Sequence, residues 1–227
     1  MLSKQIAVEL PPAWSIKRPK DVMQSSYDLV GAPLRMALLP DHTCERLHLT
    51  SLRAERFAAV LCELRGRVLD VGAGDNALLK LYRAHARGPS EVSAAAASVG
   101  VDVIDWGADC VIVPNCRSLP FTDASFDTVS FVACLNHIPE RREALAEARR
   151  ILKPGGRVVV TMISRFVGVL GHAIWWYSED KRRHVAAGEE MGLDSEEVVA
   201  LLTSSRFKNV TTRRFLYKLN SLHTATK

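Results

Sequence analysis

Short β-rich runs alternate with helix-patterned segments from Arg67 to the end of the chain. This alternation is the strongest constraint on the fold, because strands connected through helices form a parallel sheet flanked by helices. We expect strands at Val68 to Val71, Ser98 to Ile104, Cys110 to Val113, Thr128 to Leu135, Arg157 to Ile163, Asn209 to Tyr217 and Ser221 to Thr226. Too few residues separate the last two for a parallel crossover, so they should pair antiparallel. The sequence predicts an α/β protein with a mostly parallel seven-stranded sheet, helices on both faces and a C-terminal antiparallel hairpin.

Several helices are also predicted. Two precede the sheet, one around Tyr27 to Leu39, which Pro33 must start late or interrupt, and one from about Ser51 to Leu64, after an irregular arm that extends to about residue 25. Another lies between the fourth and fifth strands, where Pro139 suits a first helical turn, and it ends before Pro154-Gly155-Gly156. Asp194 with Glu197 has the pattern of a capping box and opens a further helix through Leu202.

Length and composition exclude several classes of protein. The chain has 227 residues, of which 48% are hydrophobic, and fits one domain with modest additions. The net charge is +5, but the arginine clusters alternate with acids, which indicates a solvated surface and makes a nucleic-acid partner unlikely in our interpretation. The five cysteines contain no C-x-x-C pair, so we expect reduced thiols in the cytoplasm and no metal site. The sequence does not indicate an oligomeric state.

Membrane and export signals are not expected either. The longest apolar stretch, Phe166 to Tyr177, is too short to cross a bilayer and contains His172. Met1 to Trp14 has no continuous apolar core followed by a small-residue cleavage site, so it does not have the pattern of a secretory signal.

One strand-to-helix turn has the residues of a ligand site. It reads Val68-Leu69-Asp70-Val71-Gly72-Ala73-Gly74-Asp75-Asn76. Gly72 and Gly74 permit a tight turn and let a ligand approach the backbone, at the carboxyl end of a strand where open α/β sheets bind ligands. Near the end of the second strand Asp102 can bind a ribose diol, and Asp105 is an alternative for this role. An ordinary strand-to-helix turn shares the glycine pattern, and the order of the later motifs strengthens the ligand-binding interpretation.

Further motifs follow in a fixed order. They are Asn115, Leu119-Pro120-Phe121, Asp123-Ala124-Ser125-Phe126-Asp127 and Leu152-Lys153-Pro154-Gly155-Gly156. From about Val68 to Ile163 this order resembles the methyltransferase superfamily that includes the ubiquinone and menaquinone biosynthesis C-methyltransferases. The resemblance implies a class I, Rossmann-like methyltransferase that uses S-adenosylmethionine (SAM) and releases S-adenosylhomocysteine (SAH).

The resemblance also implies which residues bind the cofactor. They are Asp70, Gly72, Ala73, Gly74, Asp102, Val103, Trp106, Asn115, Cys116, Leu135 and Asn136. Asp70 and the backbone of the turn would hold the methionine end of SAM, and Asp102 the ribose hydroxyls. Asn115 stands where the family usually has Asp, and its carbonyl can still accept a hydrogen bond from the adenine amino group. Trp106 either lies against the adenine face or fills core.

Two departures from the family pattern bear on the adenine side. The third glycine often found in the first motif is replaced by Asn76, which tolerates a left-handed conformation or caps the helix. Only Asp105 to Asp109 connect the second and third strands, so the usual crossover helix must be missing or vestigial and the adenine pocket more open. The segment from His85 to Ala97 is correspondingly long.

For methyl transfer the sulfonium is already electrophilic, so the main tasks are to align the acceptor and to exclude water. If the acceptor must lose a proton, His137 is the nearest candidate catalytic base and His172 the second; either could instead only line the pocket.

We divide the chain into N-terminal helices (1–65) that cover the active site and a SAM-binding domain (66–227). An aromatic insertion at about 164–192 either forms a lid over a partly hydrophobic small molecule or anchors itself to the core.

Two other functions fit parts of the sequence. A nicotinamide-dependent oxidoreductase uses the same kind of sheet, and Ala77 is tolerated where its motif ends in glycine. The Leu-Pro-Phe and Pro-Gly-Gly motifs and the final hairpin favour the methyltransferase. A non-catalytic binding protein with the SAM-binding fold is the second alternative.

Overall fold

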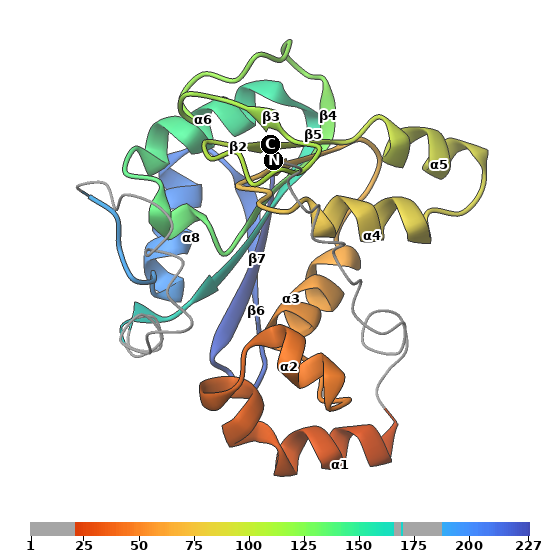
Figure 1. Ribbon diagram of the computed structural model, residues 1–227. Helices are drawn as coiled ribbons and strands as arrows, with labels where there is room; N and C mark the ends of the chain where they lie inside the picture. The colour runs from red at the N-terminus through yellow and green to blue at the C-terminus, as the bar shows by residue number, and fades with distance from the viewer. Residues whose placement is uncertain (1–20, 166–168, 170–187) are drawn as a thin grey trace, which may run out of the picture.

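The computed structural model describes residues 21–165, 169 and 188–227. The strands among them form a seven-stranded sheet in the order β3-β2-β1-β4-β5-β7-β6 (Figure 1). The strands are β1 (Val68–Val71), β2 (Val99–Asp102), β3 (Val111–Ile112), β4 (Phe126–Val132), β5 (Leu152–Ile163), β6 (Lys208–Phe215) and β7 (Asn220–Thr226). Strands β1 to β5 pair in parallel, whereas β7 runs antiparallel to both β5 and β6. The predicted Rossmann-like sheet with a C-terminal hairpin is confirmed.

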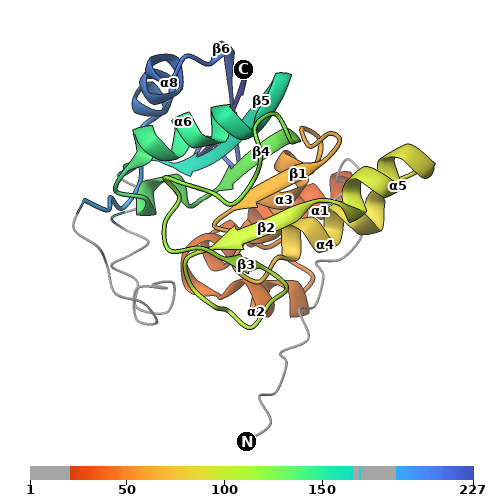
Figure 2. The same ribbon diagram turned by 90° about the horizontal axis from the view of Figure 1, so that it is seen from above.

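Helices cover both faces of the sheet (Figure 2). On one face α6 (Arg141–Ile151) and α8 (Ser195–Ser204) bury Leu145 and Val198 in one core cluster with β4 and β5. On the other face α3 (Leu52–Leu61) and α4 (Ala77–His85) bury Val60 and Leu78 in a second cluster with Val159 of β5. The predicted capping box at Asp194 opens α8. Burial of apolar side chains on both faces therefore fixes the sheet in the middle layer.

The strand ends gather at one edge, which positions the site. Since β1 to β5 are parallel, the residues after Val71, Asp102 and Val132 all leave the sheet on its carboxyl side. Strand β6 is antiparallel to β7, which is antiparallel to β5, so β6 ends at the same edge and the 216–219 turn lies there too. Side chains from distant parts of the sequence can therefore meet at this edge.

Several strand boundaries differ from the predicted ones. Strand β2 ends at Asp102 because the Asp102 carboxylate accepts a hydrogen bond from the backbone N–H of Ile104 and turns the chain. Strand β4 ends at Val132 because Ala133 adopts a positive φ of 54°, and Leu135 belongs to a 3₁₀ turn, η3 (Leu135–His137). Strand β5 begins early, at Leu152, which pairs with Phe126 before a register shift.

The N-terminal helices also differ from the prediction. Helix α1 (Val22–Val30) begins inside the expected irregular arm, because the Asp21 side chain caps it by accepting from the N–H of Gln24. The predicted helix over 27–39 is two elements, α1 and the π-helical turn η2 (Leu34–Leu38), and α2 (Asp41–Arg46) follows. The interruption expected from Pro33 is confirmed, because α1 ends at Val30 with Gly31 as its C-cap and η2 begins directly after Pro33.

The long 85–97 segment contains a helix that the sequence did not predict, α5 (Pro89–Ala96). Arg83 of α4 donates to the carbonyl groups of Ala95 and Ser98, which holds α5 beside α4. Between β2 and β3 no helix forms in the fully described residues 103–110, as predicted. The extra helix thus precedes β2, and the usual position after β2 has a short connection instead.

Two of the sequence motifs stabilise the sheet at the edge opposite the site. The Lys153 ammonium donates to both carboxylate oxygens of Asp127, at 2.8 and 2.9 Å, and Asp127 also accepts from the N–H of Arg67. A β-carbon on Gly66 would lie 2.5 Å from the Asp127 carboxylate, so Gly66 must lack a side chain. The Ser-Phe-Asp and Leu-Lys-Pro-Gly-Gly motifs therefore fix β4 against β5 and do not contact the carboxyl edge.

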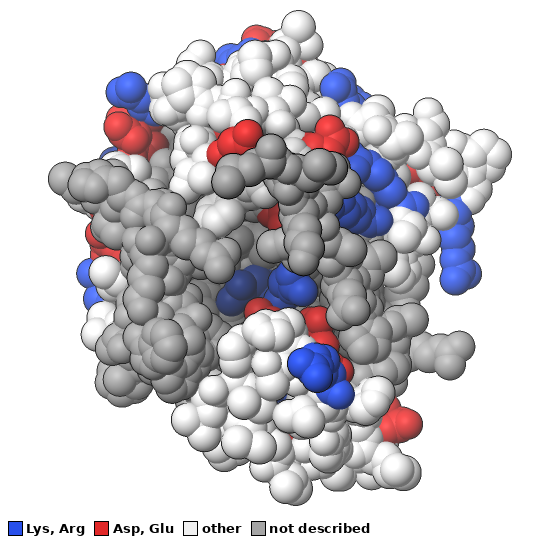
Figure 3. Space-filling model, in the orientation of Figure 1, with Lys and Arg blue, Asp and Glu red and all other residues white. Residues whose placement is uncertain are grey.

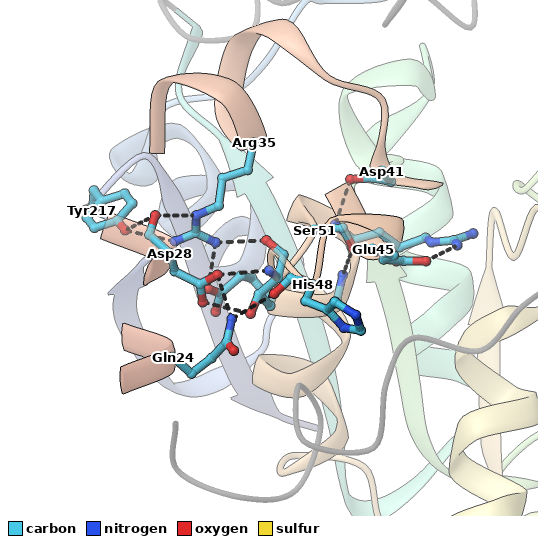
Figure 4. A network of polar contacts seen from close by, with 12 residues as sticks. Gln24, Asp28, Arg35, Asp41, Glu45, His48, Ser51 and Tyr217 are labelled. Carbon is cyan, nitrogen blue, oxygen red and sulfur yellow. Dashed lines mark hydrogen bonds and ion pairs between the residues drawn. The ribbon is translucent and has the colours of Figure 1, made fainter. Parts of the chain in front are cut away.

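A buried polar network attaches residues 21–50 to the sheet (Figure 4). Arg35, 2% exposed, donates to the carbonyl groups of Asp28 and Thr50, to the Glu55 carboxylate and to the Tyr217 hydroxyl. The Asp28 carboxylate accepts from the N–H and the hydroxyl of Thr50. Neither core cluster includes a residue from 21–50. Hydrogen bonds and ion pairs, Arg35–Glu55 and Glu45–Arg53, rather than a shared apolar cluster, hold this layer against α3 and the β6–β7 turn.

Candidate functional site

The glycine-rich turn leaves β1 at the carboxyl edge. The N–H groups of Gly72 and Ala73 both donate to the carbonyl of Val101, at 2.9 and 3.1 Å, which draws the turn across the end of β2. Three positions have positive φ, +70° at Gly72, +56° at Gly74 and +57° at Asn76. Asparagine tolerates this region better than most residues with a side chain, so Asn76 can replace the glycine expected there.

The two glycines have different roles. A β-carbon on Gly72 would lie 2.7 Å from that of Cys134, so the position is packed against the chain that follows β4. A β-carbon on Gly74 would meet no atom within 4 Å. Gly74 therefore presents bare backbone to an open space at the edge of the sheet, as a close ligand contact requires, and Gly72 makes room for the neighbouring chain.

Asp102 lies directly beside Gly74. Its carboxylate accepts from the N–H of Gly74 at 2.8 Å and from the N–H of Ile104 at 3.0 Å. Asp105, the alternative that the sequence left open, is exposed and accepts from the N–H of Gly107 in a local turn. The structure therefore favours Asp102 as the acid that faces a ligand on the turn.

Asp70 is an acid buried inside the sheet. It is 2% exposed, and its carboxyl group accepts a hydrogen bond from the Ser130 hydroxyl at 2.7 Å. Burial raises the pKa of Asp70 to about 7, the Ser130 hydrogen bond opposes this rise, and the negative charges of Asp102 and Asp75 add to it. A positive charge bound at the carboxyl edge would favour the ionised carboxylate.

The residues expected on the adenine side lie along the chain after β2 and β3. Val103 is 52% exposed, and Trp106 is half-buried in the short 103–110 connection. Asn115 follows β3, and its side-chain oxygen accepts from the N–H of Arg117 at 3.0 Å. Cys116 is buried, which raises the pKa of its thiol to about 11 and keeps it neutral. These residues are brought to one edge, while their contacts to a ligand stay predictions.

The residues expected near the acceptor form a clamp after β4. Leu135 is fully buried, and the Asn136 amide donates to the Glu190 carbonyl at 2.8 Å while the N–H of Glu190 donates back to the Asn136 carbonyl. His137 Nδ1 lies 3.1 Å from the Glu189 carboxylate, and its Nε2 lies 3.1 Å from the Asn136 amide nitrogen. This arrangement selects the tautomer with the proton on Nδ1 and an acceptor at Nε2.

One charged residue at the turn was missed from the sequence. Arg53 of α3 pairs with Asp75 at 3.2 Å, directly after Gly74, and its Nε is buried without a hydrogen-bond partner. A second, longer pairing joins Arg53 to Glu45 at 3.8 Å. Twenty-two positions separate Arg53 from Asp75, so no local pattern could have connected them. The arginine brings positive charge to the glycine-rich turn.

Known proteins share the pattern of this site. A methyltransferase domain family, Methyltransf_11, matches residues 69–160. The ubiquinone/menaquinone biosynthesis C-methyltransferase UbiE of Bordetella avium is 35% identical over 120 residues, 49% of this chain and 46% of that protein. The UbiE of Burkholderia mallei is 30% identical over 187 residues, 71% of this chain and 75% of that protein.

The chain belongs to the class I SAM-dependent methyltransferases. Within them it falls in the UbiE-like branch, as the motif order indicated. The matched region spans about half the length of the first UbiE relatives, 46% and 48%.

Solved methyltransferase structures share the fold. One from Thermotoga maritima, described as a possible histamine N-methyltransferase, aligns with a TM-score of 0.55 at 20% identity, over 89% of this chain and 95% of that one. The 1,6-didemethyltoxoflavin-N1-methyltransferase of Burkholderia thailandensis, solved with bound SAH, aligns with a TM-score of 0.52 at 18% identity, over 93% of each. The class I fold of this methyltransferase-family chain is thus confirmed.

The surface of this class I family member is hollowed between the sheet and the N-terminal helices. Figure 3 shows Lys and Arg side chains at the bottom of this hollow and a mostly uncharged surface with a few charged side chains below it. No helix in the described ranges is long and apolar enough to span a membrane. Within those same ranges no three His, Cys, Asp or Glu residues are placed to bind a metal ion. His172, Trp175, Trp176 and most of the insertion lie outside the described residues, so the lid remains a prediction.

Proposed function

We propose that this protein transfers the methyl group of SAM to a small-molecule acceptor that is partly hydrophobic. The observation that carries the proposal is the bare backbone at Gly74 beside the Asp102 carboxylate. A ribose diol has two hydroxyl donors, and Asp102 offers a carboxylate at the end of β2 to accept them. Family membership supports SAM as the donor, with SAH as the product.

The charges around the turn match the methionine end of the donor. SAM carries a sulfonium, an ammonium and a carboxylate. We propose that ionised Asp70 favours the positive groups and that Arg53 binds the carboxylate in exchange for part of its pairing with Asp75. When bound, SAM supplies the electrophilic methyl group, and the residues of this chain orient it and exclude water.

On the acceptor side, His137 is our candidate for the proton-accepting residue. Glu189 would hold the Nδ1 proton and stabilise a protonated ring, which leaves Nε2 as the acceptor. The Asn136 amide now donates to Nε2, so an acceptor hydroxyl would have to take its place. The clamp between Asn136 and Glu190 puts this histidine next to the chain that returns from the insertion.

The N-terminal helices and the 164–192 insertion are our proposed acceptor-binding parts, and the division into 1–65 and 66–227 is proposed with them. We also propose a cytoplasmic location, which is consistent with five cysteines that are all free thiols. UbiE relatives are named for ubiquinone and menaquinone biosynthesis. A quinone-like aromatic acceptor is accordingly the first class of compound to test.

Product formation from labelled donor tests the proposal directly. The full chain is incubated with methyl-labelled SAM and a bacterial small-molecule extract, and SAH and labelled products are measured by mass spectrometry. We expect SAH that depends on both protein and extract and that falls strongly in Asp102→Ala. Binding of SAH without turnover would indicate a non-catalytic binding protein. A rise of the melting temperature with NADH but not with SAM would indicate an oxidoreductase.

A further inference from the structure

The connection between β2 and β3 lacks the support of a crossover helix. Residues 103–110 span the whole distance, and Val111 and Ile112 of β3 are 40% and 47% exposed. Hydrogen bonds from the neighbouring chain hold this connection instead. The neighbouring chain is the glycine-rich turn.

Asn76 ties the turn to this connection. Its side chain is fully buried, and its Nδ2 donates to the carbonyl of Asp109 at 2.5 Å. Its Oδ1 is buried without a hydrogen-bond partner and faces Gly100, where a β-carbon would come within 2.8 Å. An unsatisfied buried oxygen is unfavourable. The amide is therefore not optimised for stability, and a small apolar residue or glycine would avoid this cost.

Two further contacts converge on the same place. The Cys110 thiol lies 3.6 Å from the Gly74 carbonyl, to which it donates, and the Asp102 carboxylate joins the N–H groups of Gly74 and Ile104. The start of the connection is thus fixed by Asp102, and its end by Cys110 and Asn76. Of these three residues, only Asn76 stands at a position where the family pattern often has glycine, and its hydrogen bond to Asp109 therefore depends on this replacement.

We propose that Asn76 is a positioning residue that fixes the 103–110 connection as the wall of the adenosine site, in place of the missing helix. This inference rests on the proposed function. A glycine at position 76 could adopt the same φ of +57° but could not reach Asp109. Asparagine combines the left-handed backbone of the turn with an amide that crosses to the connection.

Asn76→Gly is the sharpest test, because it keeps the backbone conformation and removes only the amide. Binding of SAH and of 5′-methylthioadenosine is measured by calorimetry on the full chain. The second probe has the adenosine but no amino-acid carboxylate. We expect the Kd of both probes to rise about tenfold in Asn76→Gly, since one fixed hydrogen bond of the wall is lost.

Arg53→Gln provides the matched control at the other end of the donor. It should weaken SAH but leave methylthioadenosine within about twofold of the wild-type Kd, because this probe lacks the carboxylate. Hydrogen exchange of the ligand-free protein should show faster exchange at residues 103–110 in Asn76→Gly and no such change in Arg53→Gln.

The melting temperature separates positioning from a purely structural role. Because the unsatisfied Oδ1 is removed together with the amide, Asn76→Gly should lose little thermal stability compared with its loss of affinity. A lower melting temperature with unchanged Kd for both probes would overturn the proposal. Wild-type protein that binds neither probe would instead refute the proposed function, so the two failures are distinguishable.

Discussion

Asp70 couples proton binding to stability and, in the proposed function, to donor binding. Its pKa is about 7 in the folded chain and 3.8 in the absence of burial. Between these values the folded state keeps a proton that the unfolded state has lost, so Asp70 lowers the free energy of unfolding as pH rises from about 4 to 7, with no further change above 7. Above pH 7 the buried carboxylate is ionised and available to a cationic donor.

Asp70→Asn should therefore stabilise the ligand-free protein and weaken donor binding. The amide still accepts the Ser130 hydrogen bond but carries no buried charge. Urea unfolding should show a larger gain at pH 8 than at pH 5, with SAM affinity reduced at pH 8. Exposed Asp105→Asn is the control and should change neither. Equal effects on stability at both pH values would contradict the role of the charge.

In wild-type protein the same group predicts how SAM binding depends on pH. A bound cation favours ionised Asp70, so binding should release protons near pH 7 and SAM affinity should fall as pH drops from 8 to 6. Calorimetry in buffers of different ionisation enthalpy measures the proton release. Release that persists in Asp70→Asn would assign it to another group.

His137→Gln should slow methyl transfer about a hundredfold without changing SAH affinity, if the acceptor loses a proton to Nε2. Glu189→Gln should have a smaller effect and shift the pH profile of turnover, because the neutral amide stabilises the protonated ring less well. The exposed His42→Gln variant is the control. Full turnover in His137→Gln would exclude this histidine as the proton acceptor and leave it only its contacts with Asn136 and Glu189.

Single site residues were predictable from the sequence where a local motif identifies them. Asp102 and Gly74 were predicted because a strand end and a glycine are local signals, and the structure brings them within hydrogen-bonding distance. Arg53 and Glu189 were not predicted, because each meets its partner across a long stretch of chain. Gly72 was correctly placed in the turn, but its need to avoid Cys134 is a tertiary contact that the motif does not reveal.

Among the elements, α1 has an unusual orientation. Its buried residue is Asp28, while Val22, Met23 and Val30 are 85%, 83% and 82% exposed. The apolar side chains of this helix therefore contribute little to its attachment in the folded chain. The attachment depends on the Arg35 network, in which each buried polar group needs its partners.

Tyr217→Phe should loosen this layer without loosening the sheet. The hydroxyl that accepts from Arg35 at 2.8 Å is lost, whereas the ring stays under the guanidinium, 5.3 Å from its centroid. The free energy of local opening, measured by hydrogen exchange, should fall by about 1–2 kcal/mol in residues 21–50 and change little in β4 and β5. Tyr82→Phe, which loses its bond to the Gly66 carbonyl, is the control and should leave residues 21–50 unchanged. Uniform loosening of the whole chain would contradict separate attachment.

Elements were predictable where apolar spacing reflects burial. Helix α6 and strands β1, β4 and β7 bury most of their apolar side chains, and these three strands were predicted to within three residues. Helix α5 has Ala95 as its buried residue and a run of small side chains, so its spacing carries no signal. The interruption between α1 and η2 was predictable because Pro33 cannot continue a helix, whereas α2 was not predicted.

Two kinds of attachment hold the molecule together, one apolar and one polar. The sheet and its helices share two apolar clusters, whereas residues 21–50 are held by polar contacts at the carboxyl edge. Local opening of that layer would break the pairing of Glu45 with Arg53, which also pairs with Asp75 beside the glycine-rich turn, and donor binding should oppose the opening. The sequence predicted helices over the site but could not show that their attachment is polar.

The central claim is that the carboxyl edge at Gly74 and Asp102 binds SAM, and calorimetry with SAH on the full chain tests it most directly. We predict one site per chain, no heat with NADH, and a loss of about 1–3 kcal/mol in Asp102→Ala, which removes charged hydrogen bonds from the site. A well-folded wild-type sample that gives no heat with SAH or SAM would contradict the claim.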